Sequence, residues 1–202
     1  MKFNVKNMII VIELITILFL LTLISVYFFE NSTVQNNMET EKKWLIKVED
    51  IPYDLSKANK YEIVQTYLNF SPEMRVRNIN DGEFYVLTIK RDTKSLGLVR
   101  EEYEILLNQE EYNNLLAKQE GNTIKKTRYQ LENEDGLIMA IDIFSGELEG
   151  LAYLEIEFKD KETAENYGTP DWVIQDVTTD LDYKNGHLSR YGIPNSFYEY
   201  MK

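Results

Sequence analysis

Hydrophobic and polar residues alternate with a period of two through most of the chain after residue 38. This alternation is typical of β-strands, because successive side chains point to opposite faces of a sheet. The turn sequences Asn80-Asp81-Gly82 and Glu134-Asp135-Gly136 favour tight hairpins between neighbouring segments. The pattern therefore predicts an antiparallel fold of short strands. The predicted strands are Glu39–Val48, Glu62–Phe70, Glu73–Ile79, Phe84–Arg91, Leu98–Ile105, Thr123–Leu131, Leu137–Phe144 and Leu151–Phe158.

Two short helices are predicted between these strands. Asn108 and Glu111 form a capping-box pattern at a helix start, and Gly121 is expected near the end of this helix. Asp160 is a suitable N-cap for a second helix that continues to about Tyr167. The first helix is expected to bury Tyr112, Leu115 and Leu116.

A hydrophobic segment, Met8–Phe29, precedes the predicted strands and is long enough to cross a bilayer as a helix. It exceeds the apolar region of a signal peptide and no small-residue cleavage pattern follows, so we interpret it as an uncleaved membrane anchor. Glu13 is costly within such a segment, although its place near the start keeps it close to interfacial water. The alternative is that translation begins at Met38, in which case the hydrophobic segment is not part of the protein.

The composition is that of a folded domain with a limited choice of chemistry. The 202 residues are 44% hydrophobic and 28% charged, and they include no Cys and a single His. These counts exclude disulfide frameworks, thiolate metal sites and clusters of histidine ligands, and the one histidine, His187, is expected in a loop. The formal net charge of −12 argues against a general nucleic-acid-binding surface, which would be basic.

Charged residues share one face of the predicted strands, at positions i and i+2. They are Glu39, Glu41, Lys43, Arg75, Arg77, Lys90, Arg100, Glu102, Glu104, Lys126, Arg128, Asp142, Glu155 and Glu157. Like charges recur along single strands, as in Arg75 and Arg77, an arrangement that a plain solvated surface would avoid. Paired carboxylates suit divalent cations and paired arginines suit phosphate oxygens, so separate acidic and basic walls are expected.

The opposite face of the same strands is apolar, as at Trp44, Val76, Leu87 and Leu154. Nearly every strand contributes to this face, and the sequence offers no second sheet to cover it. Closing the sheet with its charged face inward satisfies both faces. The sequence therefore predicts a mainly β (α+β) fold, an eight-stranded antiparallel β-barrel tunnel with a charged lumen and helices packed outside, preceded by one transmembrane helix. An antiparallel sheet with one wet, charged face is the simpler alternative.

The order of these motifs resembles that of CYTH-domain proteins, the triphosphate tunnel metalloenzymes. The segment ETEKKWLIK (Glu39–Lys47) is similar to the ExExK motif that opens this domain, and the resemblance continues to about Pro194. The further matching blocks are MRVR (Met74–Arg77), LTIK (Leu87–Lys90), REEYE (Arg100–Glu104), KTRY (Lys126–Tyr129), IDIF (Ile141–Phe144), LEIEF (Leu154–Phe158) and DVTTDLDYKN (Asp176–Asn185). One block departs from the family, because Thr179–Asp182 is acidic where relatives often carry basic residues.

The resemblance implies an eight-stranded tunnel in which Mg²⁺ or Mn²⁺ assists the hydrolysis or cyclisation of triphosphates. The implied metal ligands are Glu39, Glu41, Asp142, Glu155 and Glu157, with Glu102 and Glu104 as acids of the same lumen. The implied phosphate-binding residues are Arg75, Arg77, Lys90, Lys126 and Arg128, with Arg100 beside them and Lys184 near the tunnel mouth. Lys43 is expected near the reacting phosphate, because its strand places it beside two metal ligands.

The resulting hypothesis is a metal-dependent triphosphatase, a hydrolase that acts on inorganic tripolyphosphate or a nucleoside triphosphate. One alternative is adenylate cyclase chemistry in the same tunnel, where the ribose hydroxyl replaces the attacking water. Another is a non-enzymatic, membrane-tethered sensor of polyphosphate or nucleotides. Each hypothesis expects a small-molecule triphosphate as the partner and no general nucleic-acid binding.

The predicted organisation places the tunnel domain after the anchor. Lys2 and Lys6 precede the anchor, and no basic residue follows it until Lys42, so the positive-inside tendency predicts a single-pass anchor with its N-terminus in the cytoplasm. The domain is then expected outside, whereas nucleoside triphosphates and magnesium favour the cytoplasmic face. The predicted parts are a basic flank at 1–7, the anchor at 8–29, a linker at 30–38, the tunnel domain at 39–195 and a C-terminal tail at 196–202.

Overall fold

The computed structural model describes residues 34–93 and 98–201, and from Met38 onward it also describes their side chains. The predicted anchor Met8–Phe29 and the basic flank before it lie outside the described residues. Within the described ranges, no helix is long and apolar enough to cross a membrane.

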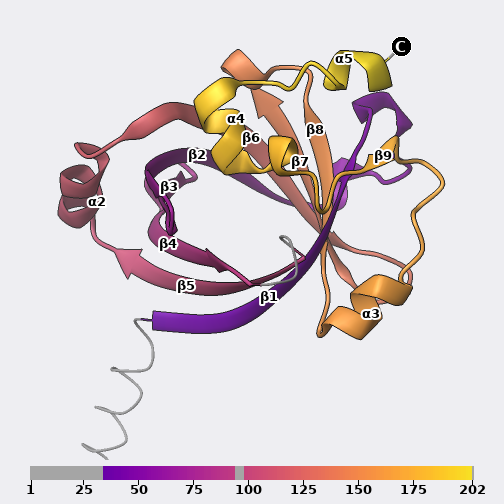
Figure 1. Cartoon of the computed structure of the whole chain (residues 1–202), viewed down its shortest axis with the longest axis horizontal. Helices are drawn as coiled ribbons and strands as arrows, with labels where there is room; N and C mark the ends of the chain where they lie inside the picture. The colour runs from indigo at the N-terminus through magenta and orange to yellow at the C-terminus, as the bar shows by residue number, and fades with distance from the viewer. Residues whose placement is uncertain (1–33, 94–97, 202) are drawn as a thin grey trace, which may run out of the picture. The chain divides into compact units, whose positions relative to one another are not determined.

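Eight strands form a closed antiparallel barrel, which confirms the predicted eight-stranded barrel (Figure 1). They are β1 (Val34–Leu45), β2 (Asn59–Phe70), β3 (Glu73–Ile79), β4 (Phe84–Asp92), β5 (Val99–Leu107), β6 (Glu120–Glu132), β7 (Ile138–Ser145) and β8 (Ala152–Glu157). Their order around the barrel is β5-β4-β3-β2-β6-β7-β8-β1, and a further pairing of β5 with β1 closes the ring. Each predicted strand therefore exists, although β1 begins at Val34, within the segment expected to be a linker. A two-residue strand, β9 (Gln175–Asp176), pairs with the C-terminal end of β1, at Trp44 and Leu45.

Both predicted helices are present, with the expected N-terminal caps. In α2 (Gln109–Leu116), the Asn108 side chain accepts from the backbone N–H of Glu111 at 3.0 Å, and the Glu111 carboxylate accepts from the backbone N–H of Asn108 at 2.8 Å. In α3 (Lys161–Asn166), Asp160 accepts from the backbone N–H of Thr163 at 2.7 Å. Of the residues expected beneath α2, Tyr112 is buried, while Leu115 and Leu116 are only half-buried.

The expectation that Gly121 ends this helix is wrong, because α2 ends at Leu116 and Gly121 lies within β6. Gly121 has a φ of +69°, and a Cβ at this position would lie 2.7 Å from Oγ of Ser189. The glycine is therefore required where β6 approaches the C-terminal part of the chain closely, not as a helix terminator.

Two helices near the C-terminus, α4 (Asn185–Tyr191) and α5 (Phe197–Tyr200), are absent from the sequence-based prediction. His187 therefore lies in a helix rather than in a loop, and α5 lies within the segment expected to be a tail. These helices are too short to show a clear hydrophobic period. The remaining helical turns are η1 (Val48–Asp50), η2 (Leu55–Lys57), η3 (Gly146–Leu148) and η4 (Leu181–Tyr183).

An apolar plug fills part of the lumen at the barrel end that α4 and α5 cover (Figure 1). It is made of Leu45, Tyr67, Ile124, Phe144, Tyr153, Val177, Tyr183, Leu188 and Phe197. Leu45 and Tyr153 are cross-strand partners two residues from the pair Lys43 and Glu155, so they point to the same side of the sheet as those charges. The predicted charged lumen therefore does not extend to this end of the barrel, which is closed by hydrophobic packing on the side of β1, β2, β6, β7 and β8.

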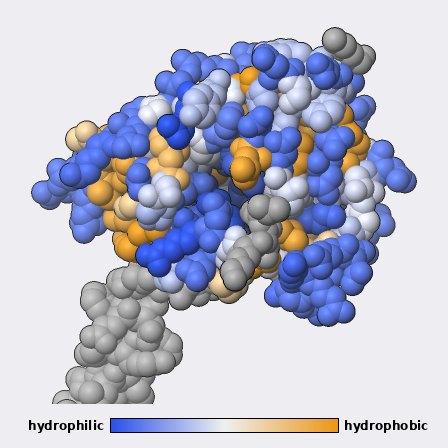
Figure 2. All heavy atoms as spheres, viewed as in Figure 1, coloured by the Kyte–Doolittle hydropathy of each residue, from blue (hydrophilic) through white to orange (hydrophobic). Residues whose placement is uncertain are grey.

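A second hydrophobic core covers the outer face of β1, β7 and β8. Trp44, Ile141, Leu154 and Ile156 are completely buried there, against residues that include Ala164 of α3. The outward apolar face is thus covered on this wall as predicted. On β4 and β5 the corresponding residues Leu87, Ile89, Tyr103 and Ile105 are only half-buried, so helices do not cover the whole barrel. The face seen in Figure 2 is mostly hydrophilic, with separate hydrophobic patches.

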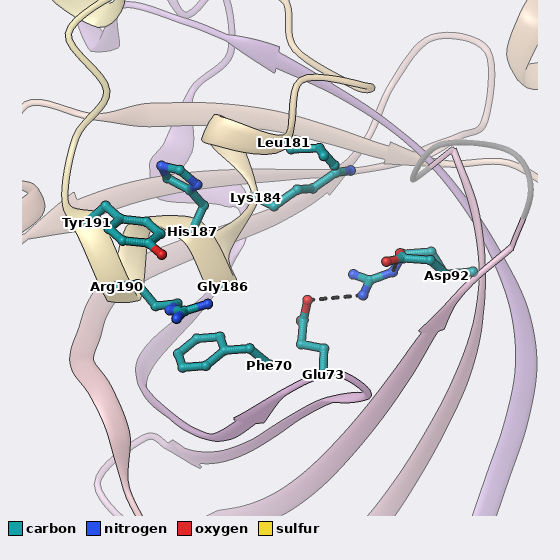
Figure 3. A pocket seen from close by; sticks show the side chains of 10 residues that line it. Phe70, Glu73, Asp92, Leu181, Lys184, Gly186, His187, Arg190 and Tyr191 are labelled. Carbon is teal, nitrogen blue, oxygen red and sulfur yellow. Dashed lines mark hydrogen bonds and ion pairs between the residues drawn. The ribbon is translucent and has the colours of Figure 1, made fainter.

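A pocket of about 290 Å³ lies beside the plug, between α4 and the adjoining ends of β2, β3, β4 and β5 (Figure 3). Phe70 and Glu73 contribute from one wall, and His187, Arg190 and Tyr191 of α4 contribute from the other. The plug and the pocket thus occupy the same end of the barrel.

The packing of Phe197 in the plug leads to a prediction about α5. Replacing the buried Phe197 by alanine should lower the free energy of unfolding by about 3 kcal/mol, because the loss of the ring leaves a cavity in the plug. Phe84→Ala is the matched control, since Phe84 is 46% exposed and its loss should cost less than about 1 kcal/mol. Urea denaturation of the two variants measures the difference, and equal losses would show that α5 does not hold the barrel end.

Candidate functional site

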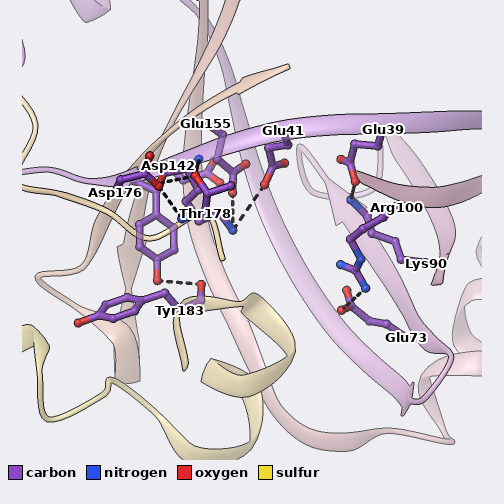
Figure 4. A network of polar contacts seen from close by, with 12 residues as sticks. Glu39, Glu41, Glu73, Lys90, Arg100, Asp142, Glu155, Asp176, Thr178 and Tyr183 are labelled. Carbon is purple, nitrogen blue, oxygen red and sulfur yellow. Dashed lines mark hydrogen bonds and ion pairs between the residues drawn. The ribbon is translucent and has the colours of Figure 1, made fainter. Parts of the chain in front are cut away.

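Figure 4 shows Glu41, Asp142 and Glu155 on the wall formed by β1, β7 and β8. The buried Lys43 of β1 belongs to the same group of charges. Its ammonium is 2.9 Å from a carboxylate oxygen of Glu155 and 3.8 Å from one of Glu41, and it lies 5.0 Å from the ring centre of Tyr153. Burial lowers the pKa of Lys43, but Glu155 and Glu41 outweigh this and raise it above its ordinary value. Lys43 is therefore held as a cation inside the barrel.

Asp142 is completely buried and accepts hydrogen bonds from two bases of β6. Nε and Nη2 of Arg128 each donate to it at 2.7 Å, and Nζ of Lys126 contacts it as well. Burial raises the pKa of Asp142, but Arg128 and Lys126 hold it below its usual range. Arg128 also contacts Glu155, so this wall is one continuous network of ion pairs.

A second network lies on the wall of β3, β4 and β5. Lys90 contacts Glu39 and is 3.3 Å from Glu102, while Nη2 of Arg100 is 3.0 Å from Glu73. Arg75 stands between these acids, 3.6 Å from Glu73 and 3.9 Å from Glu102. The structure therefore brings these predicted metal-side and phosphate-side residues into direct contact.

Arg77 lies on the same wall as this network, with partners of its own. It contacts Glu104 and donates a hydrogen bond to the hydroxyl of Thr88 at 3.0 Å. The side chain of Glu104 is the more exposed of the two, at 35% against 14% for Arg77. This pair thus sits where the lumen begins to open to solvent.

The expected separation into acidic and basic walls is wrong. The antiparallel register places Lys43 opposite Glu155, Arg128 opposite Asp142, and Lys90 between Glu73 and Glu102. Like charges recur along some strands, as in Arg75 and Arg77 of β3, but opposite charges meet across strands in these pairs. Cross-strand neighbours are the closer pair. The lumen is therefore neutralised from within by its own acids and bases.

Three carboxylates on the paired strands β1 and β8 have other carboxylates among their close neighbours. Glu41 lies directly opposite Glu157 in the register, and Glu39 is on the same face of β1. Burial first, and then the neighbouring carboxylates Glu155 and Glu39, raise the pKa of Glu41; burial, Glu39 and Glu41 raise that of Glu157. Mutual repulsion of oxygen donors is the condition that a hard divalent cation relieves, so Glu39, Glu41 and Glu157 fit Mg²⁺ or Mn²⁺ in their chemistry. In the described part of the chain, no group of three or more acidic or histidine side chains is arranged to hold a metal ion.

Two arginines carry donors that suit an anion. The Nε–H groups of Arg75 and Arg77 are buried and donate to no acceptor among residues 34–93 and 98–201. A buried donor without an acceptor costs about 1–3 kcal/mol, so such groups generally find a partner. Both arginines also face acids, Arg75 at Glu102 and Arg77 at Glu104. This arrangement is suited to binding several phosphate oxygens at once.

Lys184 reaches the same region from the junction of η4 and α4. Burial, followed by repulsion from Lys43, lowers its pKa to about 8, with an opposing attraction from Glu41. Lys126 is similar, because burial and the neighbouring Arg128 lower its pKa to about 8. Lys184 therefore interacts electrostatically with charged residues of the lumen. This agrees with the prediction that it lies near the tunnel mouth.

The sequence-based prediction missed some residues of the site. Glu73 stands two residues before Arg75 on the same face of β3, so the period that identified Arg75 and Arg77 could have identified it. Thr178 left no such signal: its hydroxyl oxygen accepts from the backbone N–H of Lys43 at 3.0 Å, across 135 residues of sequence. The contact fixes β1 at Lys43 and arises only from the fold.

A closed antiparallel barrel whose lumen holds buried acids and bases is the class of fold that these residues define. The CYTH domain matches residues 37–183, which is most of the chain, and this protein belongs to the CYTH-domain family. The expected family is thereby confirmed.

Two relatives from bacteria match over most of their own length. The chain is 32% identical to an inorganic triphosphatase of Nitrosomonas europaea over 154 residues, covering 75% of this chain and 96% of the relative. It is 34% identical to an inorganic triphosphatase of Acetivibrio thermocellus over 150 residues, covering 74% and 92%. The crystal structure of the inorganic triphosphatase NE1496 is similar with a TM-score of 0.54 at 30% identity, covering 75% of this chain and 93% of that one.

The buried Asp142 makes a prediction about stability and its pH dependence. Asp142→Ala should lower the free energy of unfolding by about 3–5 kcal/mol at neutral pH, because Arg128 and Lys126 lose their main counter-charge. The folded-state pKa of Asp142 lies below its unfolded value, so this stabilisation is present above about pH 4 and is lost as pH falls through the folded pKa. The difference between wild type and variant should therefore shrink on acidification.

Urea denaturation at several pH values measures this difference. Asp171→Ala, at an exposed position, is the control and should change stability by less than about 0.5 kcal/mol. A loss for Asp142→Ala that stays constant down to acidic pH would contradict the ion-pair explanation.

Proposed function

We propose that this protein is a divalent-metal-dependent triphosphatase that hydrolyses a phosphoanhydride bond of inorganic tripolyphosphate inside its barrel. One observation carries the proposal: the buried Nε–H groups of Arg75 and Arg77 have no hydrogen-bond acceptor among the described residues. The two arginines share the lumen with Lys43, Lys90 and Arg100. Two relatives at 32% and 34% identity that are inorganic triphosphatases support the same reaction.

Substrate binding in this lumen is an exchange of partners. Lys90, Arg75 and Arg77 contact carboxylates in the structure, and a triphosphate would compete for the same guanidinium and ammonium groups. Phosphate oxygens carry more charge than a single carboxylate, and arginine can engage them through two N–H groups. The basic side chains would then hold the phosphates and stabilise the charge that develops during transfer.

The exchange has a consequence for the acids. When bases turn to the phosphates, the carboxylates that faced them lose their counter-charge and become available for a cation. Glu39, Glu41 and Glu157 would hold Mg²⁺ or Mn²⁺, and the ion supplies charge neutralisation on phosphate oxygens and an oriented water. Lys43 is next to Glu41 and Glu155, so its ammonium is the base that we place nearest to the reacting phosphate.

Turnover assays on the full chain test the reaction. Tripolyphosphate, ATP and thiamine triphosphate are each supplied with Mg²⁺ or Mn²⁺, and phosphate, pyrophosphate and cyclic AMP are measured. Metal-dependent release of phosphate from tripolyphosphate supports the proposal. Release of cyclic AMP and pyrophosphate from ATP, without hydrolysis of tripolyphosphate, would instead indicate a cyclase. Binding without turnover would indicate a sensor.

Removing one anion-binding donor should abolish most turnover. Arg77→Ala should lower kcat/KM for tripolyphosphate by about 100-fold or more, because a charge-assisted donor to the phosphate oxygens is lost. Arg91→Ala is the control, since Arg91 is exposed on the outer side of β4 and should retain full activity. The melting temperatures of both variants should stay near that of wild type, and equal activities would contradict the assigned role of Arg77.

Changing a metal-side acid should alter the metal dependence. Glu41→Gln should raise the Mg²⁺ or Mn²⁺ concentration needed for half-maximal activity by about 10-fold or more, because the amide is a weaker ligand than the carboxylate. Glu120→Gln, at an exposed position, serves as the control. An unchanged metal requirement in Glu41→Gln would remove β1 from the metal site.

A further inference from the structure

The backbone groups of β1 point alternately to its two sides, as in any antiparallel strand. On the side of β8, Ile46 donates to the carbonyl of Ala152 at 3.1 Å. On the other side, where β5 closes the ring, Glu41 donates to the carbonyl of Leu98 at 3.1 Å. Lys43 is two residues from Glu41, so its backbone N–H and carbonyl point to this second side as well.

The C-terminal segment holds the second side of β1 at Lys43. The backbone N–H of Lys43 donates to the hydroxyl oxygen of Thr178 at 3.0 Å. Its carbonyl accepts from that hydroxyl at 3.3 Å and from the backbone N–H of Val177 at 2.9 Å. The strand β9 continues along the same edge, where it pairs with Trp44 and Leu45. One hydroxyl group therefore bonds to both polar groups of the Lys43 backbone.

Thr178 has a well-defined position of its own. It is 4% exposed, and its backbone N–H donates to Oδ1 of Asp176 at 2.9 Å (Figure 4). Asp176 in turn lies 3.5 Å from the ammonium of Lys42, and the neighbouring Val177 belongs to the apolar plug. The hydroxyl of Thr178 is thus a fixed point against which β1 is placed.

The position of the β1 backbone decides where the Lys43 ammonium lies. Lys43 and Glu155 are cross-strand partners whose ammonium and carboxylate are 2.9 Å apart. The backbone groups of Lys43 point away from β8, and antiparallel pairs of this kind bring their side chains closest together. A displacement of about 1 Å at a reacting group can cost about 100-fold in rate. The hydroxyl of Thr178 is therefore connected to the charged lumen through a single residue.

We propose that Thr178 is a positioning residue, whose hydroxyl holds the Lys43 ammonium at its place beside the reacting phosphate. The proposal rests on the proposed function, because it requires that Lys43 act on a triphosphate. Thr178 itself contacts the β1 backbone and not the substrate. Its loss should therefore slow the chemical step and leave phosphate binding by Arg75 and Arg77 intact.

Kinetics of the full chain with tripolyphosphate and Mg²⁺ test this role. Thr178→Val removes the hydroxyl at nearly constant volume, and it should lower kcat by about 10-fold or more while KM changes by less than about two-fold. Thr178→Ser keeps the hydroxyl and should retain kcat within about three-fold of wild type. The melting temperature of each variant shows that it is folded.

Thr66→Val is the matched control, because it also removes a buried, hydrogen-bonded hydroxyl from the barrel. Thr66 is 1% exposed and its hydroxyl is 3.1 Å from that of Thr123, on the outer face that Val76 shares. This variant should keep the kcat of wild type even where its melting temperature falls. A kcat for Thr178→Val equal to that of Thr66→Val overturns the proposal. An equal loss in Thr178→Ser, or a raised KM at unchanged kcat, overturns it as well.

NMR of the Lys43 side chain gives a readout that does not depend on turnover. The ammonium lies 5.0 Å from the ring centre of Tyr153, so the ring current shifts the signal of the adjoining CεH₂ group, which Lys43→Arg identifies by its absence. The signal should move in Thr178→Val and stay in place in Thr178→Ser and Thr66→Val. A signal that stays in all three variants overturns the positioning role, whether or not tripolyphosphate is hydrolysed. A wild-type chain that hydrolyses no tripolyphosphate overturns the proposed function, while the signal still decides whether Thr178 positions Lys43.

Discussion

The pairing of buried charges is the constraint on which the rest of this structure depends. Lys43, Lys126, Asp142 and Glu155 are all at least 95% buried, and isolated charges at such depth would cost several kcal/mol each. The barrel meets this cost through register, because each buried acid has a base on the neighbouring strand. A shift of one residue in any pairing would turn a whole set of charges outward and expose their partners unpaired. Pairing therefore fixes the strand register as firmly as hydrophobic burial does.

In the proposed function, the same pairing prepares the lumen for ligands. Ion pairs between flexible side chains can exchange, and both halves of the exchange have ligands of suitable chemistry: phosphate for the bases and a divalent cation for the acids. The like-charged pair of Glu41 and Glu157 marks the place where internal pairing is incomplete, whereas Glu39 contacts Lys90. Binding of an anion and binding of a cation would each make the other more favourable, since each releases the counter-charges that the other needs.

Hydrophobic packing supports the charged lumen from two sides. One core lies outside the wall of β1, β7 and β8, and the apolar plug lies inside the barrel beneath α4 and α5. The plug is joined directly to the polar network, because Tyr153 packs under Lys43 while its hydroxyl donates to the carbonyl of Tyr183 at 3.2 Å. Tyr183 precedes Lys184, so the position of the C-terminal segment and the position of two lumen lysines are linked through one side chain.

The sequence by itself determined the strands, their polar and apolar faces and the charged residues of the lumen, because a period of two depends only on neighbouring positions in the chain. Asn108 and Asp160 likewise marked the helices α2 and α3 through local hydrogen bonds. Only the tertiary structure decided which acid meets which base, since that depends on register between strands far apart in sequence. It alone decided the plug, the pocket at α4 and the contact of Thr178 with Lys43, because these join segments whose own patterns are too short or too mixed to reveal a partner.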